Sequence, residues 1–161
     1  AYKIANLLAD EGICAALWAD WWGFKHEAYD MTIANIAIVD QARGGTGCAI
    51  VHSDSASGIQ RLNQEAAKAL AAGREAGFDI SEERAMTWIT KNPAKSLGIL
   101  EQTGTLENGK DADIVIWSGN PFSIYSKAEQ VYIDGALAFD KATNFMPHTD
   151  FDLGVKEWED K

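Results

Sequence analysis

Apolar residues recur at helical spacing in several parts of the first hundred residues, and short apolar runs separate these parts. Helices are predicted over residues 1–11, from residue 27 to the glycine pair at 44–45, over residues 59–76, and after a cap at Ser81. Strands are predicted over residues 13–17 and 47–53. Helices that alternate with short apolar strands are typical of a parallel sheet covered by helices.

The pattern changes after about residue 98. Asn92, followed by proline, predicts one more helical turn with Asn92 as its cap, and Gly98 should end it. A strand is then predicted over residues 112–117, and residues 130–139 predict two strands around an Asp-Gly turn. The mixed, acidic sequence from residue 143 predicts a C-terminal extension.

The number of predicted parallel strands is too small for a complete catalytic domain. Two parallel strands do not form a stable sheet, and a complete α/β barrel takes about 250 residues, whereas this chain has 161. The helical pattern is already under way at residue 1. We therefore expect the chain to be the C-terminal part of a larger α/β domain, with further sequence upstream.

The second predicted parallel strand ends in polar residues. His52 and Asp54 stand two positions apart and should project to one side, because alternate residues of a strand share a face. Catalytic groups gather at the carboxyl ends of parallel strands. Asp54 is thus a catalytic candidate or a simple turn or cap residue, and His52 a site residue or a hydrogen-bonded core histidine. Ser53 and Ser55 should satisfy backbone groups of the turn.

The loop after the first parallel strand, residues 18–26, is rich in aromatic residues and should lie at the same edge of the sheet. Its aromatic residues are Trp18, Trp21, Trp22 and Phe24. They could wall a pocket for an apolar or ring-bearing substrate, or pack the loop or a subunit contact. Lys25 or His26 could meet a substrate carboxylate. Arg61, just beyond Asp54, could bind a carboxylate with two hydrogen bonds or form a surface salt bridge.

Composition narrows the class of partner. Asp and Glu number 24 against 14 Lys and Arg, which gives a net charge of −10 and disfavours nucleic acid and anionic membranes. No apolar run approaches the roughly 20 residues that span a bilayer, and the localisation stays open. The two cysteines, Cys14 and Cys48, are expected to be reduced core thiols, because neither their number nor their spacing indicates a disulfide framework or a zinc site.

Three stretches of the chain resemble the amidohydrolase superfamily, in particular its imidazolonepropionase-like and dipeptidase-like members. Residues 49–55 (AIVHSDS) are similar to the last barrel strand with its active-site aspartate. Residues 90–98 (TKNPAKSLG) are similar to the helix that leaves the barrel. Residues 104–117 (GTLENGKDADIVIW), followed by NPF at 120–122 and VYIDG at 131–135, are similar to the small β-sandwich of that family.

The resemblance implies a fold and its division along the chain. The fold class would be α/β, namely the C-terminal part of a metal-dependent hydrolase (β/α)8 TIM barrel plus strands of a small appended β-sandwich. Residues 1–99 would be the last βα units, with strands seven and eight, and residues 100–142 the composite β-sandwich strands. Residues 143–161 would be a C-terminal extension. In the motif at 109–113, Gly109, Lys110, Asp111 and Asp113 are expected to be structural.

The resemblance also implies a cofactor: one or two divalent metal ions, usually zinc, with Asp54 as metal ligand or as acceptor of the water proton. His52 is expected to support the site from behind, and the position of Trp22, Lys25, His26 and Arg61 at this edge makes them the candidates for contact with substrate. The chain departs from the family pattern, because it has three histidines (His26, His52 and His148) and no His-x-His pair. The other ligands would have to come from the N-terminal remainder of the protein.

The function that follows is a metal-dependent hydrolase of carbon–nitrogen bonds, acting on a cyclic amide, an N-acyl amino acid or a dipeptide. The alternative is a catalytically inactive relative that serves as a binding or assembly module. The expected partners are the N-terminal remainder and a small amide or peptide-like substrate. A second copy of the same protein is a further candidate partner.

Overall fold

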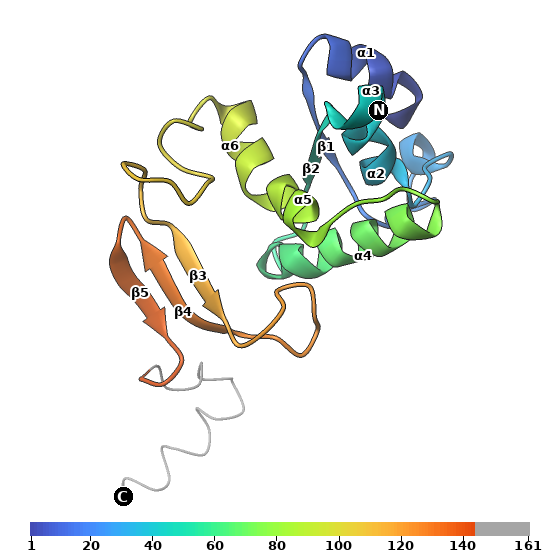
Figure 1. Ribbon diagram of the computed structural model, residues 1–161. Coiled ribbons are helices and arrows are strands. Elements are labelled where there is room, and N and C mark those ends of the chain that lie inside the picture. Colours follow the sequence, from blue (N-terminus) through green and yellow to red (C-terminus); the bar gives the residue numbers. More distant parts are fainter. Residues whose placement is uncertain (144–161) are drawn as a thin grey trace, which may run out of the picture.

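A computed structural model describes residues 1–143 of the chain (Figure 1). Its helices are α1 (Ala5–Asp10), α2 (Asn35–Asp40), α3 (Ala42–Gly45), α4 (Leu62–Glu75), α5 (Glu82–Met86) and α6 (Lys91–Leu97). Single 3₁₀ turns cover Tyr2–Ile4, His26–Ala28, Ile59–Arg61 and Thr87–Ile89. The strands are β1 (Cys14–Leu17), β2 (Cys48–Val51), β3 (Ile114–Trp117), β4 (Ala128–Ile133) and β5 (Ala136–Asp140). The predicted C-terminal extension, with His148, lies outside the described residues apart from residue 143.

Strands β1 and β2 form a parallel pair, as the alternation of helices and strands predicts, with Ala15 opposite Ala49. Helices α1 to α5 gather around this pair (Figure 1). Ala49 and Val51 of β2 are fully buried in the hydrophobic core. Their core neighbours are chiefly small or branched residues of α2 and α4, with Trp88 as the largest: Ile36, Ala37, Val39, Ala66, Ala69, Leu70 and Trp88. The core thus holds β2 from one side and leaves the alternate residues of the strand to face the other.

A disulfide bond joins Cys14 and Cys48, which corrects the expectation of two reduced thiols. The two residues stand opposite each other in the register of β1 and β2, with Cα atoms 4.5 Å apart. Their side chains therefore project to the same face and lie within reach of each other. Spacing along the chain could not show this contact, because it depends on which strands are neighbours and in what register.

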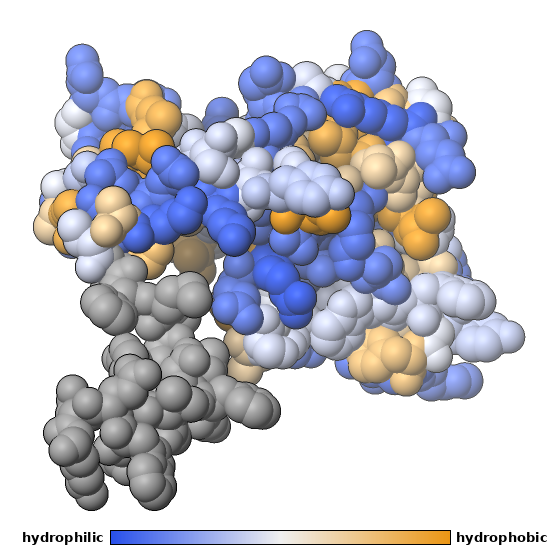
Figure 2. Space-filling model, turned by 90° about the horizontal axis from the view of Figure 1, so that it is seen from below, coloured by the Kyte–Doolittle hydropathy of each residue, from blue (hydrophilic) through white to orange (hydrophobic). Residues whose placement is uncertain are grey.

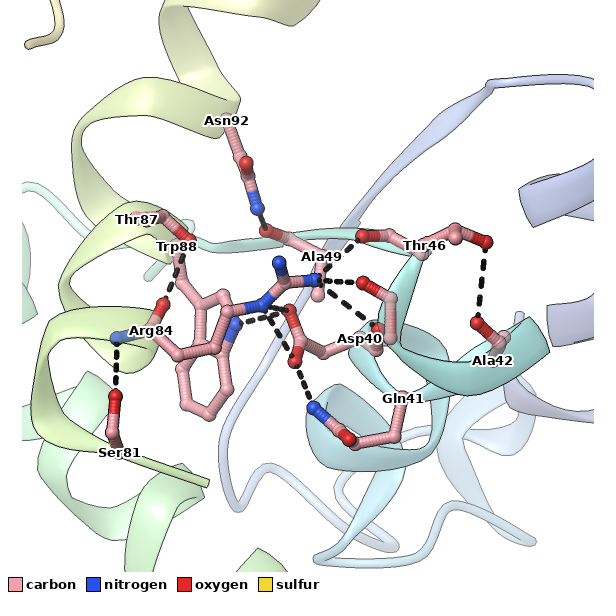
Figure 3. Close-up of polar contacts among 12 residues, drawn as sticks. Asp40, Gln41, Ala42, Thr46, Ala49, Ser81, Arg84, Thr87, Trp88 and Asn92 are labelled. Atoms are coloured by element: carbon pink, nitrogen blue, oxygen red, sulfur yellow. Dashed lines mark hydrogen bonds and ion pairs between the residues drawn. The ribbon is translucent and has the colours of Figure 1, made fainter. Parts of the chain in front are cut away.

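An ion pair with a buried carboxylate and a partly exposed arginine holds the segment that leads into β2 (Figure 3). The carboxylate of Asp40, at the end of α2, is fully buried and accepts hydrogen bonds from Arg84 Nε at 2.8 Å and from Trp88 Nε1 at 2.8 Å. Arg84 Nη2 also donates to the carbonyl oxygens of Gly45 and Gly47. A Cβ at Gly47 would lie 1.7 Å from the carbonyl oxygen of Val39, so only glycine fits there.

The strands β3, β4 and β5 form a separate antiparallel sheet, which lies beyond α6 (Figure 1). The predicted hairpin is confirmed: Asp134 and Gly135 have φ values of 50° and 76°, which suit a two-residue turn between β4 and β5. Lys110 is structural as predicted, because its ammonium group donates to the carbonyl of Leu100 and to Thr105 Oγ1. A hydrogen bond from Asn63 Nδ2 in α4 to the carbonyl of Pro121 links this region to the helices.

Two predicted elements differ in detail. The helix predicted from residue 27 is broken, because residues 29–34 are irregular and Arg43 and Gly44 take positive φ values within α3. Asn92 is not a helix cap: Thr90 takes that position, and the buried Asn92 side chain donates to the carbonyl of Ala49 in β2 at 2.7 Å. By contrast, Ser81 caps α5 and Gly98 ends α6 in the left-handed conformation, both as predicted.

Hydrophobic residues on the surface are scattered. Figure 2 shows one face on which they form separate patches among hydrophilic side chains. Ile4 and Leu7 are more than half exposed, and Leu106 and Tyr125 are more exposed still. Over the described range, none of the helices combines the length and the apolar character that a membrane crossing needs.

Candidate active site

The carboxyl ends of β1 and β2 bring two sequence-distant segments together. Trp18 follows β1 directly, and His52 follows β2. The backbone amide of His52 donates to the carbonyl oxygen of Leu17 at 3.1 Å, which extends the parallel ladder by one more hydrogen bond. Because Val51 points into the core, the His52 side chain projects to the opposite face of the pair.

Asp54 stands in the turn after β2 with a backbone φ of 51°. This left-handed conformation is uncommon for a residue other than glycine, although Asp is among the side chains that tolerate it. Hydroxyl groups fix the turn, as predicted: Ser53 Oγ donates to the carbonyl of Ser55 and accepts from its amide, and Ser55 Oγ accepts from the amide of Gly58. The Asp54 side chain is exposed and, among the described residues, takes part in no hydrogen bond or ion pair. Its carboxylate is therefore free to bind a ligand.

His52 and Asp54 line one hollow of about 510 Å³, together with Ser53, Ser55, Ala56, Ile59 and Leu62. The alternation of side chains along a strand does not explain why His52 and Asp54 lie together. Strand β2 ends at Val51, and the positive φ of Asp54 turns the chain out of the extended conformation. The turn, and not the pleat, brings the carboxylate to the same hollow as the imidazole.

Trp18 is the centre of an aromatic cluster. Its ring stacks on His52 with centroids 5.5 Å apart and on Trp21 at 5.4 Å, and it meets Phe24 edge to face at 5.1 Å. Asn35 fixes the backbone beneath it by donating from Nδ2 to the carbonyl of Trp18 at 3.0 Å. Trp18 and His52 also line a second hollow of about 290 Å³ with Tyr2, Ala16, Leu17, Glu27, Asp30, Met31 and Asn35. The sequence shows that Trp18 is aromatic, but its contact with His52 depends on the pairing of the two strands.

Two lysines at this edge of the strand pair, Lys3 and Lys68, form ion pairs with acidic residues. Lys68 contacts Asp20 and Glu65, each at 2.8 Å; burial alone would lower the pKa of Lys68, but the hydrogen bonds and charges of the two acids outweigh it and raise that pKa. Lys3 pairs with Asp30, and this contact raises the pKa of Lys3 and lowers that of Asp30. The charges in these three ion pairs are therefore already compensated within the protein.

The substrate contacts predicted from the sequence are only partly brought together. Lys25 lies against the aromatic cluster, with Nζ 4.9 Å from the ring centroid of Trp18. Trp22 is 61% exposed and makes none of the ring contacts of the cluster. Lys25, Trp22, His26 and Arg61 are all exposed and line neither of the two hollows, so their predicted contacts with substrate stay predictions.

The residues present do not make a complete metal site. A catalytic zinc ion usually takes three protein ligands. Within residues 1–143, no group of three or more His, Cys, Asp and Glu side chains could hold a metal ion. Asp54 offers one carboxylate with free oxygen atoms, and His52 at the same hollow offers an imidazole. A metal centre here would need further ligands from outside the described residues.

Known proteins are similar to this chain in sequence and in fold. A model of the Amidohydrolase family matches residues 30–146. Amidohydrolase tasK of Hapsidospora irregularis is 32% identical over 126 residues, which cover 78% of this chain and 12% of that protein. The imidazolonepropionase of Brucella suis is 47% identical over 55 residues, or 34% of this chain and 12% of the relative. The chain thus corresponds to a small part of each of these relatives.

Solved structures of other proteins have a fold similar to that of this chain. An amidohydrolase from Thermotoga maritima superposes with a TM-score of 0.72 and 34% sequence identity, over 87% of this chain and 35% of the other. An adenosine deaminase from Xanthomonas campestris with bound zinc superposes with a TM-score of 0.65 over 99% of this chain and 40% of the other. Its sequence identity of 14% shows a common fold alone. Because the family model covers most of the sequence, this chain belongs to the Amidohydrolase family.

Proposed function

We propose that this chain supplies one edge of the active site of a metal-dependent hydrolase, and that Asp54 is its catalytic carboxylate. The observation that carries the proposal is the position of Asp54: an exposed, unpaired carboxylate in a left-handed turn at the end of a parallel strand, beside a hollow it shares with His52. Residues held in uncommon backbone conformations are frequent at functional sites. An aspartate that served only as a turn residue would be expected to bond to its own backbone.

The reaction that fits is hydrolysis of an amide-type C–N bond. The carboxylate of Asp54 would accept a proton from the attacking water and later pass it to the leaving nitrogen, as a general base and then a general acid. A bound zinc ion would lower the pKa of the water to about 7. Asp54 would provide one oxygen ligand, and the N-terminal remainder of the protein the others. His52, held by Trp18, would keep the wall behind Asp54 in place.

The fold proposed for the whole protein is the TIM barrel of the family. Strands β1 and β2 would be its seventh and eighth strands, and β3 to β5 would belong to the appended β-sandwich. Support comes from the parallel pairing of β1 and β2, the separate antiparallel sheet, and the superposition on the Thermotoga amidohydrolase. The chain's substrate would be a cyclic amide, an N-acyl amino acid or a dipeptide.

The direct test uses the full-length protein. It should hydrolyse at least one of these substrate classes, measured by ring opening or by release of the free amine. A chelator should abolish turnover and added zinc should restore it. A protein that carries stoichiometric metal but cleaves none of the three classes would contradict the proposed reaction. An upstream sequence without a His-x-His pair and further histidines would instead favour an inactive binding module.

A further inference from the structure

The loop that follows β1 is closed by its own backbone hydrogen bonds and holds one lysine against its aromatic rings. The amide of Gly23 donates to the carbonyl of Ala28, and the amide of Ala28 donates to the carbonyl of Lys25, both at 3.0 Å. The ammonium group of Lys25 lies 4.9 Å from the ring centroid of Trp18 and 5.2 Å from that of Phe24. Both distances allow a cation–π interaction. The rings thus hold the charge of Lys25 in a defined position.

Lys25 differs from the other lysines of this edge in having no acidic partner. Lys3 and Lys68 form ion pairs with Asp30, Asp20 and Glu65. The ammonium group of Lys25, in contrast, lies within 4 Å of no carboxylate in the part of the chain that is described. A cation that is exposed and unpaired, yet held by aromatic rings, loses little freedom when an anion binds to it.

A single aromatic ring connects this cation to the candidate catalytic edge. Trp18 contacts Lys25 and also stacks on His52, and His52 lines the same hollow as Asp54. This chain carries a net charge of −10, so its own electrostatic field repels an anionic substrate. A positive charge close to the site would offset this repulsion for a substrate that carries a carboxylate.

We propose that Lys25, held on the Trp18 and Phe24 rings, recognises a carboxylate of the substrate, so that the site selects acidic amides over neutral ones. This inference rests on the proposed function and specifies its substrate. Glu27 lines the hollow next to Trp18 and would repel an anion placed there. The substrate carboxylate is therefore expected on the Lys25 side of the Trp18 ring, with the rest of the substrate directed toward Asp54.

The test compares two substrates that differ only in charge. One is an N-acyl amino acid, and the other is its carboxamide, in which a neutral amide replaces the carboxylate. Full-length protein should cleave the acid with a kcat/KM at least about tenfold higher, the effect expected of one hydrogen bond to a charged group. Lys25→Met should remove this preference through a higher KM for the acid, with little change in kcat. Lys127→Met, at an exposed lysine before β4, should retain it.

Equal kcat/KM values of the wild-type protein for the two substrates would overturn the inference and leave the proposed hydrolysis intact. So would an unchanged preference in Lys25→Met. If the protein cleaves neither substrate, the proposed function is decided by the cyclic amides and dipeptides, and a binding measurement decides the inference. The acid should then quench the tryptophan fluorescence at a concentration at least about tenfold lower than the carboxamide does, and Lys25→Met should abolish the difference. Absence of binding, or equal binding, would overturn the inference.

Discussion

The ring of Trp18 stacks on the imidazole of His52 with centroids 5.5 Å apart, across the ends of two strands that are 34 residues apart in sequence. Stacking of aromatic rings at this distance contributes roughly 0.5–1.5 kcal/mol beyond the burial of the rings. The contact makes the aromatic loop and the Asp54 turn parts of one surface. His52 forms no side-chain hydrogen bond among the described residues, so this ring contact is what fixes its orientation.

Replacement of Trp18 should therefore disturb the site and the fold together. Trp18→Ala removes ring contacts with His52, Trp21 and Phe24 and should destabilise the protein by about 2 kcal/mol or more, since truncation of a well-packed aromatic residue costs about 3–5 kcal/mol. Trp18→Phe should recover part of the loss. Unfolding in urea measures the change.

Trp22→Ala is the matched control. Trp22 is exposed and outside the ring contacts, so its replacement should change the stability by no more than about 0.5 kcal/mol. If Trp22 touches a ring-bearing substrate as its loop position suggests, Trp22→Ala will raise KM at unchanged stability. Equal destabilisation by the two substitutions would show that Trp18 is not the centre of the cluster.

The disulfide between Cys14 and Cys48 should stabilise the pair of strands that carries the site. Closing a loop of this length, with a sequence separation of 34, is worth about 3–4 kcal/mol in the chain-entropy model. A reductant should lower the unfolding midpoint of the wild-type protein and leave that of a Cys14→Ala/Cys48→Ala variant unchanged. The protein for this test should be made in an oxidising compartment, because cytosolic reductants keep thiols reduced. Two thiols that react with an alkylating reagent in the native, unreduced protein would contradict the pairing.

The ion pair of Asp40 and Arg84 should contribute more to the free energy of unfolding than an exposed ion pair does. Arg84→Met leaves the fully buried Asp40 carboxylate without its partner and should cost about 3–5 kcal/mol of unfolding free energy. Arg43→Met breaks a pair with Asp10 in which both side chains are about half exposed, and should cost no more than about 1 kcal/mol. Chemical denaturation of the two variants tests the difference. Similar losses in both would mean that Asp40 is not held mainly by Arg84.

The features that can be predicted best from the sequence are those that depend on residues close together in the chain. Ser81 caps α5 and Gly98 ends α6 because a side-chain oxygen and a left-handed glycine act within one turn of helix. The hairpin at Asp134 and Gly135 is local in the same sense. The position of Asp54 after a parallel strand could also be predicted, since an apolar run that ends in polar residues marks the carboxyl edge.

Contacts between distant segments could not be predicted from the pattern. Cys14 meets Cys48 only because β1 and β2 are neighbours in that register. Asn92 looks like a helix cap by its place before a proline, yet its amide binds a carbonyl of β2, 43 residues away. Trp18 is one aromatic residue among four in its loop, and nothing in the loop itself distinguishes it as the partner of His52.

The role of Asp54 is tested most directly by comparing Asp54→Asn with the wild type in the full-length protein, using the substrate that the wild type cleaves best. Asparagine keeps the shape and tolerates the left-handed turn, but it cannot accept the proton of the attacking water. We expect kcat to fall at least about a thousandfold while the unfolding midpoint stays the same, with Asp79→Asn, an exposed aspartate after α4, as the unaffected control. Activity of Asp54→Asn within a few-fold of the wild type would contradict the assignment of Asp54 as the catalytic carboxylate.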